Sequence, residues 1–142
     1  MKLFKKIEFN FVNQNNIPVK DLIVLVTVLA NKKNNYSLGF MKTDSDGKII
    51  VFRSTIETKI SEAMELFVMD YSSSINDCKD WIIIETENKI ELETRLKNIG
   101  KYYPESAKKL LELLKNCSNK FYKPLKIEHK IEDIIKITMQ NE

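Results

Sequence analysis

The chain has 142 residues, of which 43% are hydrophobic and 30% are charged, and its net charge is +3. A chain of this length can bury roughly two-thirds of its unfolded surface without help from a metal or disulfide, and its composition excludes an intrinsically disordered protein. The basic residues are almost all scattered lysines, with only Arg53 and Arg95 as arginines, which argues against sequence-specific nucleic-acid binding.

The sequence shows no export or membrane signal. The charged start is followed by alternating rather than continuous apolar residues, and the longest apolar run, Leu22 to Ala30, is far shorter than the roughly 20 residues of a membrane span. Cys78 and Cys117 lack the spacing of a disulfide framework or metal site, so we expect free thiols. We expect a soluble cytoplasmic protein, and the abundance of Ile, Lys and Asn is typical of an AT-rich bacterial genome.

The first segments predict strands. Apolar and polar residues alternate from Lys6 to Val12, which is the period of a half-buried strand. A polar turn, Asn13 to Asn16, separates this strand from the β-branched run Leu22 to Ala30. We expect that run to form a central strand whose neighbours cover both faces.

Two further strands are expected from Tyr36 to Lys42 and from Lys48 to Arg53. Between them, Thr43 to Gly47 predicts a tight turn, because an Asp-Gly pair supplies the positive φ that a hairpin needs. The sequence therefore predicts that the two strands pair with each other, antiparallel.

The middle of the chain predicts a helix between strands. Ser54 or Thr55 can cap a helix that continues with apolar residues at helical spacing. Leu66 to Tyr71 is a short apolar run that predicts a strand, and Ser72 to Asp80 is expected to be a polar loop. The β-branched run from Trp81 to Ile84 then predicts a buried strand.

Two helices are predicted next. Asn88 and Glu91 form a pair like a capping box before an apolar stripe that ends at Gly100, although Lys89 to Thr94 also alternates as a strand would. Pro104 to Tyr122 predicts a longer helix with proline in its first turn.

The C-terminal segment alternates from Leu125 to Met139, with an interruption near Glu132-Asp133 that divides two strands; a helix from Ile131 to Met139 is the alternative. No internal repeat or linker is found, so residues 1–142 are expected to form a single domain. We predict an α+β fold: an antiparallel β-sandwich-like sheet with packed helices, mainly in the C-terminal half.

The segment Ile17 to Val51 resembles the transthyretin-like β-sandwich modules, which include the carboxypeptidase-regulatory-like domains. The matching residues are Ile17-Pro18-Val19, the strand from Leu22 to Val28 and the turn from Thr43 to Lys48. The resemblance implies a sandwich-like β-half of a kind that usually serves in binding or packing. The 5-hydroxyisourate hydrolases of this fold rely on several histidines and a C-terminal Tyr-Arg-Gly-Ser, which this chain lacks, so that activity is not expected.

Few motifs suggest nucleotide or metal chemistry. With three glycines, the chain cannot build a phosphate-binding loop of the P-loop or dinucleotide type. Asp44 to Gly47 has the acidic spacing of a calcium loop, but Lys42 and Arg53 occupy the first and last ligand positions, so we interpret it as a turn. His129 is the only histidine, which leaves no His-rich metal centre.

A cysteine nucleophile is not expected either. Cys78 lies between Asp77 and Asp80, whose negative charges oppose thiolate formation, and Cys117 falls on the apolar stripe of a predicted helix.

The candidate ligand- or partner-binding residues are Asp70, Tyr71 and His129. Asp70 and Tyr71 follow a predicted apolar strand and precede a serine loop, where binding residues often lie. In the structural alternative, Asp70 only caps the loop and Tyr71 packs its ring with the hydroxyl exposed.

We expect a non-enzymatic binding protein with a protein partner, such as an immunity-type protein that neutralises a toxin or an accessory protein. Neither a cofactor nor a nucleic-acid or membrane partner is expected. The alternative is a small-molecule-binding protein or enzyme whose site is assembled from distant residues. A closed apolar pocket containing His129 or Asp70 would favour that alternative, whereas a filled core and a flat, aromatic-rich surface would favour a protein partner.

Overall fold

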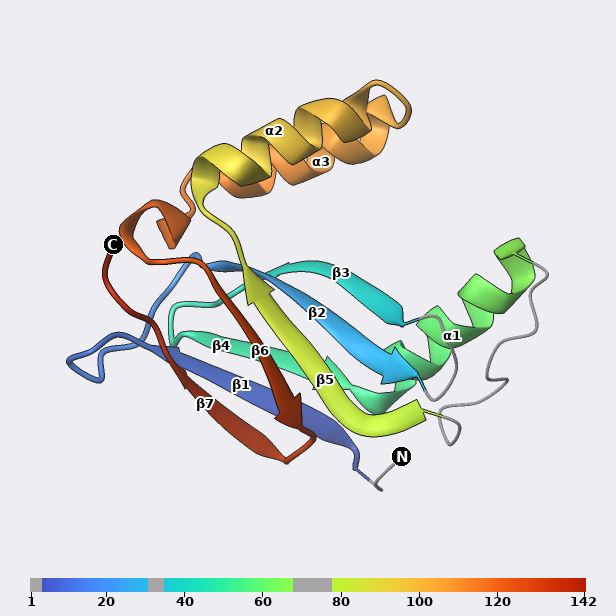
Figure 1. The fold of residues 1–142 in the computed structure, drawn as a ribbon, viewed down its shortest axis with the longest axis horizontal. Coiled ribbons are helices and arrows are strands. Elements are labelled where there is room, and N and C mark those ends of the chain that lie inside the picture. The colour runs from blue at the N-terminus through green and yellow to red at the C-terminus, as the bar shows by residue number, and fades with distance from the viewer. Residues whose placement is uncertain (1–3, 31–34, 68–77) are drawn as a thin grey trace.

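The computed structural model describes residues 4–30, 35–67 and 78–142, in which seven strands form two sheets and three α-helices flank them (Figure 1). The main hydrophobic core contains residues of both sheets, which therefore pack face to face. This arrangement confirms the predicted α+β class, the sandwich-like β-structure and the preference of the helices for the C-terminal half.

The three-stranded sheet has the order β4-β1-β7. β1 (Lys6–Val12) lies in the middle, antiparallel to β4 (Lys48–Phe52) and parallel to β7 (Ile134–Thr138). Phe9 and Phe11 of β1 point into the core, are fully buried and have ring centroids 6.5 Å apart. The predicted alternation of β1 thus places its apolar residues in the core.

The four-stranded sheet has the order β3-β2-β5-β6 and is antiparallel throughout. Its strands are β3 (Tyr36–Lys42), β2 (Ile23–Ala30), β5 (Cys78–Thr86) and β6 (Leu125–Lys130). β2 lies between β3 and β5, which confirms the prediction of a central strand.

Helix α1 (Arg53–Phe67) follows β4 directly and packs against β3 and β4, which belong to different sheets. Ile56 and Ile60 of this helix are buried in the main core. α1 therefore closes the sandwich along the side where these two edge strands meet.

Helices α2 (Lys89–Gly100) and α3 (Pro104–Leu114) form a helical hairpin beside the four-stranded sheet (Figure 1). A second, smaller hydrophobic cluster joins them to the face of that sheet opposite the main core, through Ile23 of β2. A Cβ on Gly100 would lie 3.3 Å from Cβ of Ala107, so glycine at this position allows the two helices to approach closely.

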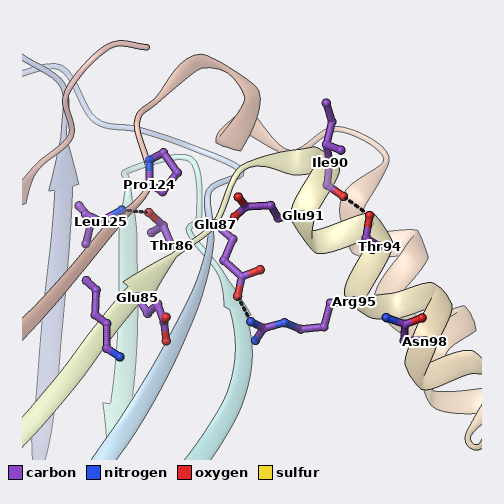
Figure 2. A pocket seen from close by; sticks show the side chains of 11 residues that line it. Glu85, Thr86, Glu87, Ile90, Glu91, Thr94, Arg95, Asn98, Pro124 and Leu125 are labelled. Atoms are coloured by element: carbon purple, nitrogen blue, oxygen red, sulfur yellow. Dashed lines mark hydrogen bonds and ion pairs between the residues drawn. The ribbon is translucent and has the colours of Figure 1, made fainter.

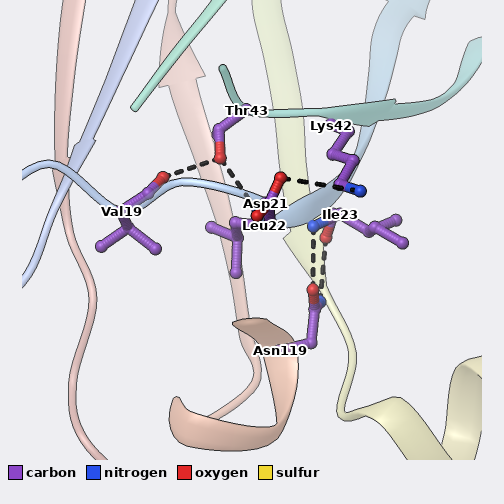
Figure 3. A network of polar contacts seen from close by, with 7 residues as sticks. All are labelled: Val19, Asp21, Leu22, Ile23, Lys42, Thr43 and Asn119. Atoms are coloured by element: carbon purple, nitrogen blue, oxygen red, sulfur yellow. Dashed lines mark hydrogen bonds and ion pairs between the residues drawn. The ribbon is translucent and has the colours of Figure 1, made fainter. Parts of the chain in front are cut away.

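A network of buried polar groups holds the base of the hairpin against β2 (Figure 3). Asn119, in the short 3₁₀ helix Ser118–Phe121, accepts a hydrogen bond from Ile23 N (2.8 Å) and donates to Ile23 O (3.0 Å) and Glu87 O (2.9 Å). The two bonds to Ile23 are buried, so they satisfy polar groups that water does not reach, and the bond to Glu87 O is part-buried.

Several local predictions are confirmed. Lys6–Val12 and Tyr36–Lys42 are strands with the predicted bounds, and Asn88 caps α2 by accepting a hydrogen bond from Glu91 N. The segment from Leu125 to Met139 contains two strands, β6 and β7, and not the alternative helix.

The predicted pairing of Tyr36–Lys42 with Lys48–Arg53 is wrong. β3 and β4 belong to different sheets, so the turn from Thr43 to Gly47 crosses from one sheet to the other. Gly47 does adopt a positive φ of 73°, and its carbonyl accepts a hydrogen bond from Phe11 N (2.9 Å). This bond lies at the end of the β1–β4 ladder. β4 therefore pairs with β1, whereas β3 pairs with β2.

Two boundaries in the middle of the chain are also wrong. Leu66 and Phe67 belong to α1 and not to a strand, and the rest of the predicted strand, 68–71, lies outside the described residues. A short apolar run does not distinguish the two structures by itself. Cys78 to Asp80, predicted as loop, begin β5, where Cys78 pairs with Ala30 of β2 and is buried.

The helix predicted from Pro104 to Tyr122 ends at Leu114. Cys117 has an extended backbone, and Ser118 N donates a hydrogen bond to Asp21 O (2.8 Å). These contacts with the sheet, together with the insertion of Asn119, stabilise a break that the apolar stripe does not reveal.

Candidate functional site

A groove of about 670 Å³ lies where β5 ends and α2 begins (Figure 2). Its walls come from the end of β5, the first turns of α2 and the start of β6. The residues that line it are Glu85, Thr86, Glu87, Ile90, Glu91, Thr94, Arg95, Asn98, Pro124, Leu125 and Lys126.

The end of the β5–β6 pair forms one wall of the groove. Thr86 is buried, and its hydroxyl oxygen accepts a hydrogen bond from Leu125 N at 3.1 Å. This bond fixes β6 against β5 where the chain of β5 turns toward α2. Pro124 and Leu125 give this wall an apolar surface.

The opposite wall is the start of α2. Asn88 Oδ1 accepts a hydrogen bond from Glu91 N (2.8 Å), which satisfies a free amide of the first turn and sets where the helix begins. The carboxylate of Glu91 is also favoured there by the helix dipole. Ile90, on the same turn, is 76% exposed and forms an apolar rim.

Glu87 is a charged group that the groove encloses almost completely. Its side chain is only 11% exposed, and Oε1 lies 2.5 Å from Arg95 Nη2. Within the described residues no well-aligned hydrogen bond reaches this buried oxygen, so the ion pair is what compensates its charge. Burial raises the pKa of Glu87 above 4.5; Arg95 opposes this rise, whereas Glu85 and Glu91 add to it.

The position of Glu87 depends on the network at the base of the hairpin. Asn119 Nδ2 donates to the carbonyl of Glu87. Figure 3 shows the two bonds of the same side chain to the backbone polar groups of Ile23. The link between β5 and α2 is therefore fixed to β2, and the groove is held by the sandwich rather than by a free loop.

The groove carries an excess of negative charge. Three carboxylates, Glu85, Glu87 and Glu91, share it with two cations, Arg95 and Lys126, and Glu85 lies directly opposite Lys126 in the β5–β6 ladder. A cationic group in the groove would be attracted, and a phosphate would be repelled. In the part of the chain that the structure describes, no three His, Cys, Asp or Glu side chains are grouped so that they could hold a metal ion.

The predicted site residues lie elsewhere or outside the described structure. His129 is on β6, opposite Ile82, partly buried, and its Nδ1 lies 2.6 Å from its neighbour's carbonyl, Lys130 O. It is not among the residues that line the groove. Asp70 and Tyr71 fall outside the described residues, so their proposed role with His129 stays a prediction.

The two cysteines are buried at opposite ends of β2. Cys78 pairs with Ala30 at one end, and Cys117 packs in the small cluster with Ile23 at the other. They are therefore too far apart for a disulfide. In the acidic turn, Asp44 Oδ1 accepts hydrogen bonds from Asp46 N and Lys48 N, both at 2.9 Å, which is the role of a turn-forming aspartate.

Sequence reasoning did not single out Glu85, Glu87 or Arg95. One usable signal was present: the acidic stretch around Glu87 follows a buried strand and precedes a capped helix, a place where binding residues often lie. No such signal marked Leu125 and Lys126 of β6, because they become neighbours of Glu85 and Thr86 only through the pairing of β6 with β5.

Comparisons with known proteins identify no family. No family model matches the chain, and no curated protein matches it. Among solved structures, the chain is similar to a 9R-lipoxygenase from Cyanothece PCC8801, with 12% sequence identity and a TM-score of 0.40. The match covers 96% of this chain but only 16% of that protein, so the likeness carries no argument about function. No helix in the described residues is long and apolar enough to cross a membrane.

Proposed function

We propose that the chain is a non-enzymatic binding protein that holds a basic segment of a protein partner in the groove beside α2. The observation that supports this most is the position of the largely enclosed carboxylate of Glu87 in a groove where three carboxylates outnumber two cations. An arriving guanidinium or ammonium group would balance the excess negative charge of the groove.

The walls of the groove suit a lysine or arginine side chain in particular. These side chains combine a long apolar stem with a charged end. Ile90, Pro124 and Leu125 offer apolar contacts for the stem, and the carboxylates lie beside them. The groove is open along the surface, which fits an extended segment better than a small molecule that needs enclosure on all sides.

In this proposal the chain acts by binding to another protein, as an immunity-type or accessory protein does. The alternative of an enzyme rests on Asp70, Tyr71 and His129. Within the described residues, His129 lies apart from the groove and from Glu87, so no observation favours a reaction over binding.

A titration with a simple cationic probe tests the proposed site. A peptide of six arginines, added to the isotopically labelled chain, should shift the amide NMR signals of Glu85, Thr86, Glu91 and Arg95. A peptide of six glutamates is the control and should leave these signals in place. Shifts spread evenly over the surface, or centred on another region, would contradict the proposed site.

The same titration has a predicted pH dependence. Because the raised pKa of Glu87 means that part of its charge is lost at acid pH, binding of the cationic peptide should weaken as pH falls through that pKa. Glu87→Gln should weaken binding and remove this part of the pH dependence.

A further inference from the structure

The face of the three-stranded sheet that points away from the core, named here the outer sheet face, is not covered by any described helix (Figure 1). α1 packs beside β3 and β4, and the α2–α3 hairpin joins the other sheet through Ile23. The exposure of the outer sheet face therefore needs an explanation of its own.

Three large apolar side chains are exposed on this face. Ile50 and Phe52, which alternate with buried residues of β4, are 42% and 52% exposed, and Ile134 of β7 is 60% exposed. Ile50 and Ile134 flank the same residue of β1, Glu8, in the sheet register. Single exposed apolar residues are ordinary, but three on one small sheet face are typical of an interaction surface.

Lysines surround these apolar residues. In the register of the sheet, Lys6 lies opposite Phe52, and Lys48 and Lys136 lie in the row next to Ile50 and Ile134. Glu8 is already engaged, because Lys48 Nζ lies 3.8 Å from its Oε1 and Asn10 Nδ2 donates to its Oε2 at 3.1 Å.

A hollow of about 480 Å³ opens beside Ile134. Its lining includes Lys5 and Lys6 as well as Glu8 and Asp133. Together with Lys48 and Lys136, this gives the face and its hollow more lysines than carboxylates.

We propose that the outer sheet face is a docking surface for a second protein, one that presents apolar side chains bordered by carboxylates. The apolar residues supply the dry centre of such a contact, and the lysines supply a charged rim that selects an acidic partner. The surface is separate from the groove beside α2 and has the opposite charge.

The charges argue against two other occupants. A second copy packed through the same face would bring lysines against lysines. An anionic lipid surface would press against Glu8 and Asp133, which lie next to Ile134. An acidic protein can instead place its carboxylates at the lysines and keep them away from Glu8 and Asp133.

The test compares three tagged forms of the full chain: wild type, a face variant with Ile50→Ser and Phe52→Ser, and a control variant with Tyr102→Ser and Tyr103→Ser. The control removes aromatic residues that are 79% and 67% exposed at the turn between α2 and α3. All four side chains are exposed, so each variant should keep its fold, which circular dichroism and thermal unfolding check. A second face variant, Lys6→Gln with Lys136→Gln, keeps the apolar residues and removes two charges.

Proteins captured from lysate are identified by mass spectrometry, and the purified complex is then footprinted with hydroxyl radicals. We expect a partner that wild type and control retain and that both face variants lose by at least tenfold. In the complex, Ile50, Phe52 and Ile134 should be protected from oxidation and Tyr102 should not.

Equal capture by all forms, protection elsewhere, or no captured protein would overturn the proposal. Concentration-dependent dimerisation abolished in the face variant would assign the surface to a second copy. Binding to phosphatidylserine vesicles, with no protein captured, would assign it to a membrane. A groove variant, Glu85→Gln with Glu91→Gln, separates the two sites, because it should leave the footprint of Ile50 and Phe52 unchanged.

Discussion

At the scale of single residues, Asn119 connects the fold to the groove. It satisfies both backbone groups of Ile23 and the carbonyl of Glu87 in a buried position. Asn119→Ala leaves these groups without partners, and we expect a loss of about 3 kcal/mol in the free energy of unfolding. Urea unfolding measures this loss. Asn116→Ala, at an exposed position, is the control and should change stability by less than about 0.5 kcal/mol.

Two glycines with positive φ provide a matched comparison. A Cβ on Gly47 would lie 2.6 Å from Phe11 O, whereas a Cβ on Gly39 would meet nothing within 4 Å. Both alanine variants suffer backbone strain, which costs on the order of 1 kcal/mol, but only Gly47→Ala also pushes a Cβ against the backbone at Phe11 O and Val19 N. We expect Gly47→Ala to be the less stable by about 2 kcal/mol in denaturant unfolding; equal losses would show that the close approach is unimportant.

The raised pKa of Glu87 predicts how stability depends on pH. The folded chain binds this proton more tightly than the unfolded chain, so the contribution to stability is fully present below pH 4.5 and is lost as pH rises through the raised pKa. Glu87→Gln should remove this decline. Unfolding free energies of the variant and wild type are measured from below pH 4.5 to above the raised pKa. They should converge at acid pH and differ above the raised pKa, with the variant the more stable. Glu105→Gln, at an exposed position on α3, should follow wild type.

At the scale of elements, the two hydrophobic clusters predict unequal stability. The strands share the large core between the sheets, whereas α2 and α3 depend on the small cluster around Ile23, Leu92 and Leu96. We expect the amides of the hairpin to exchange with deuterium at a lower opening free energy than those of β1 and β2. Leu96→Ala should speed exchange in the hairpin and leave β1 nearly unchanged. Equal protection of hairpin and strands would show that they unfold as one unit.

Elements with strong local patterns were predictable from sequence. The alternation of β1, the two C-terminal strands and the Asn88 cap depend on neighbouring residues, and they appear where expected. The pairing of β4 with β1 and the break after Leu114 depend on hydrogen bonds between distant segments, as from Phe11 N to Gly47 O. Such bonds leave no trace in local periodicity.

The groove was harder to predict than the fold, for the same reason. Its acidic wall is one continuous stretch around Glu87, but Leu125 and Lys126 reach it only through the pairing of β5 with β6. Of the candidates chosen from sequence, His129 lies on β6 but does not line the groove. Asp70 and Tyr71 lie outside the described residues.

At the scale of the whole molecule, the net charge is only +3, yet two surfaces carry local charges of opposite sign. The groove beside α2 has an excess of carboxylates, and the outer sheet face has an excess of lysines. Both proposed contacts should therefore weaken as ionic strength rises, because exposed charges are screened by salt.

In the proposed function, the chain binds a protein partner through the groove beside α2. The most direct measurement is quantitative capture from lysate and secreted fractions of the source organism with three forms of the chain. These are wild type, the groove variant Glu85→Gln with Glu91→Gln, and a control of equal charge, Glu105→Gln with Glu112→Gln on α3. We predict a stoichiometric partner that wild type and control retain and the groove variant loses by at least tenfold. Equal recovery with all three forms, or no partner at any ionic strength, would show that the groove does not bind a protein partner.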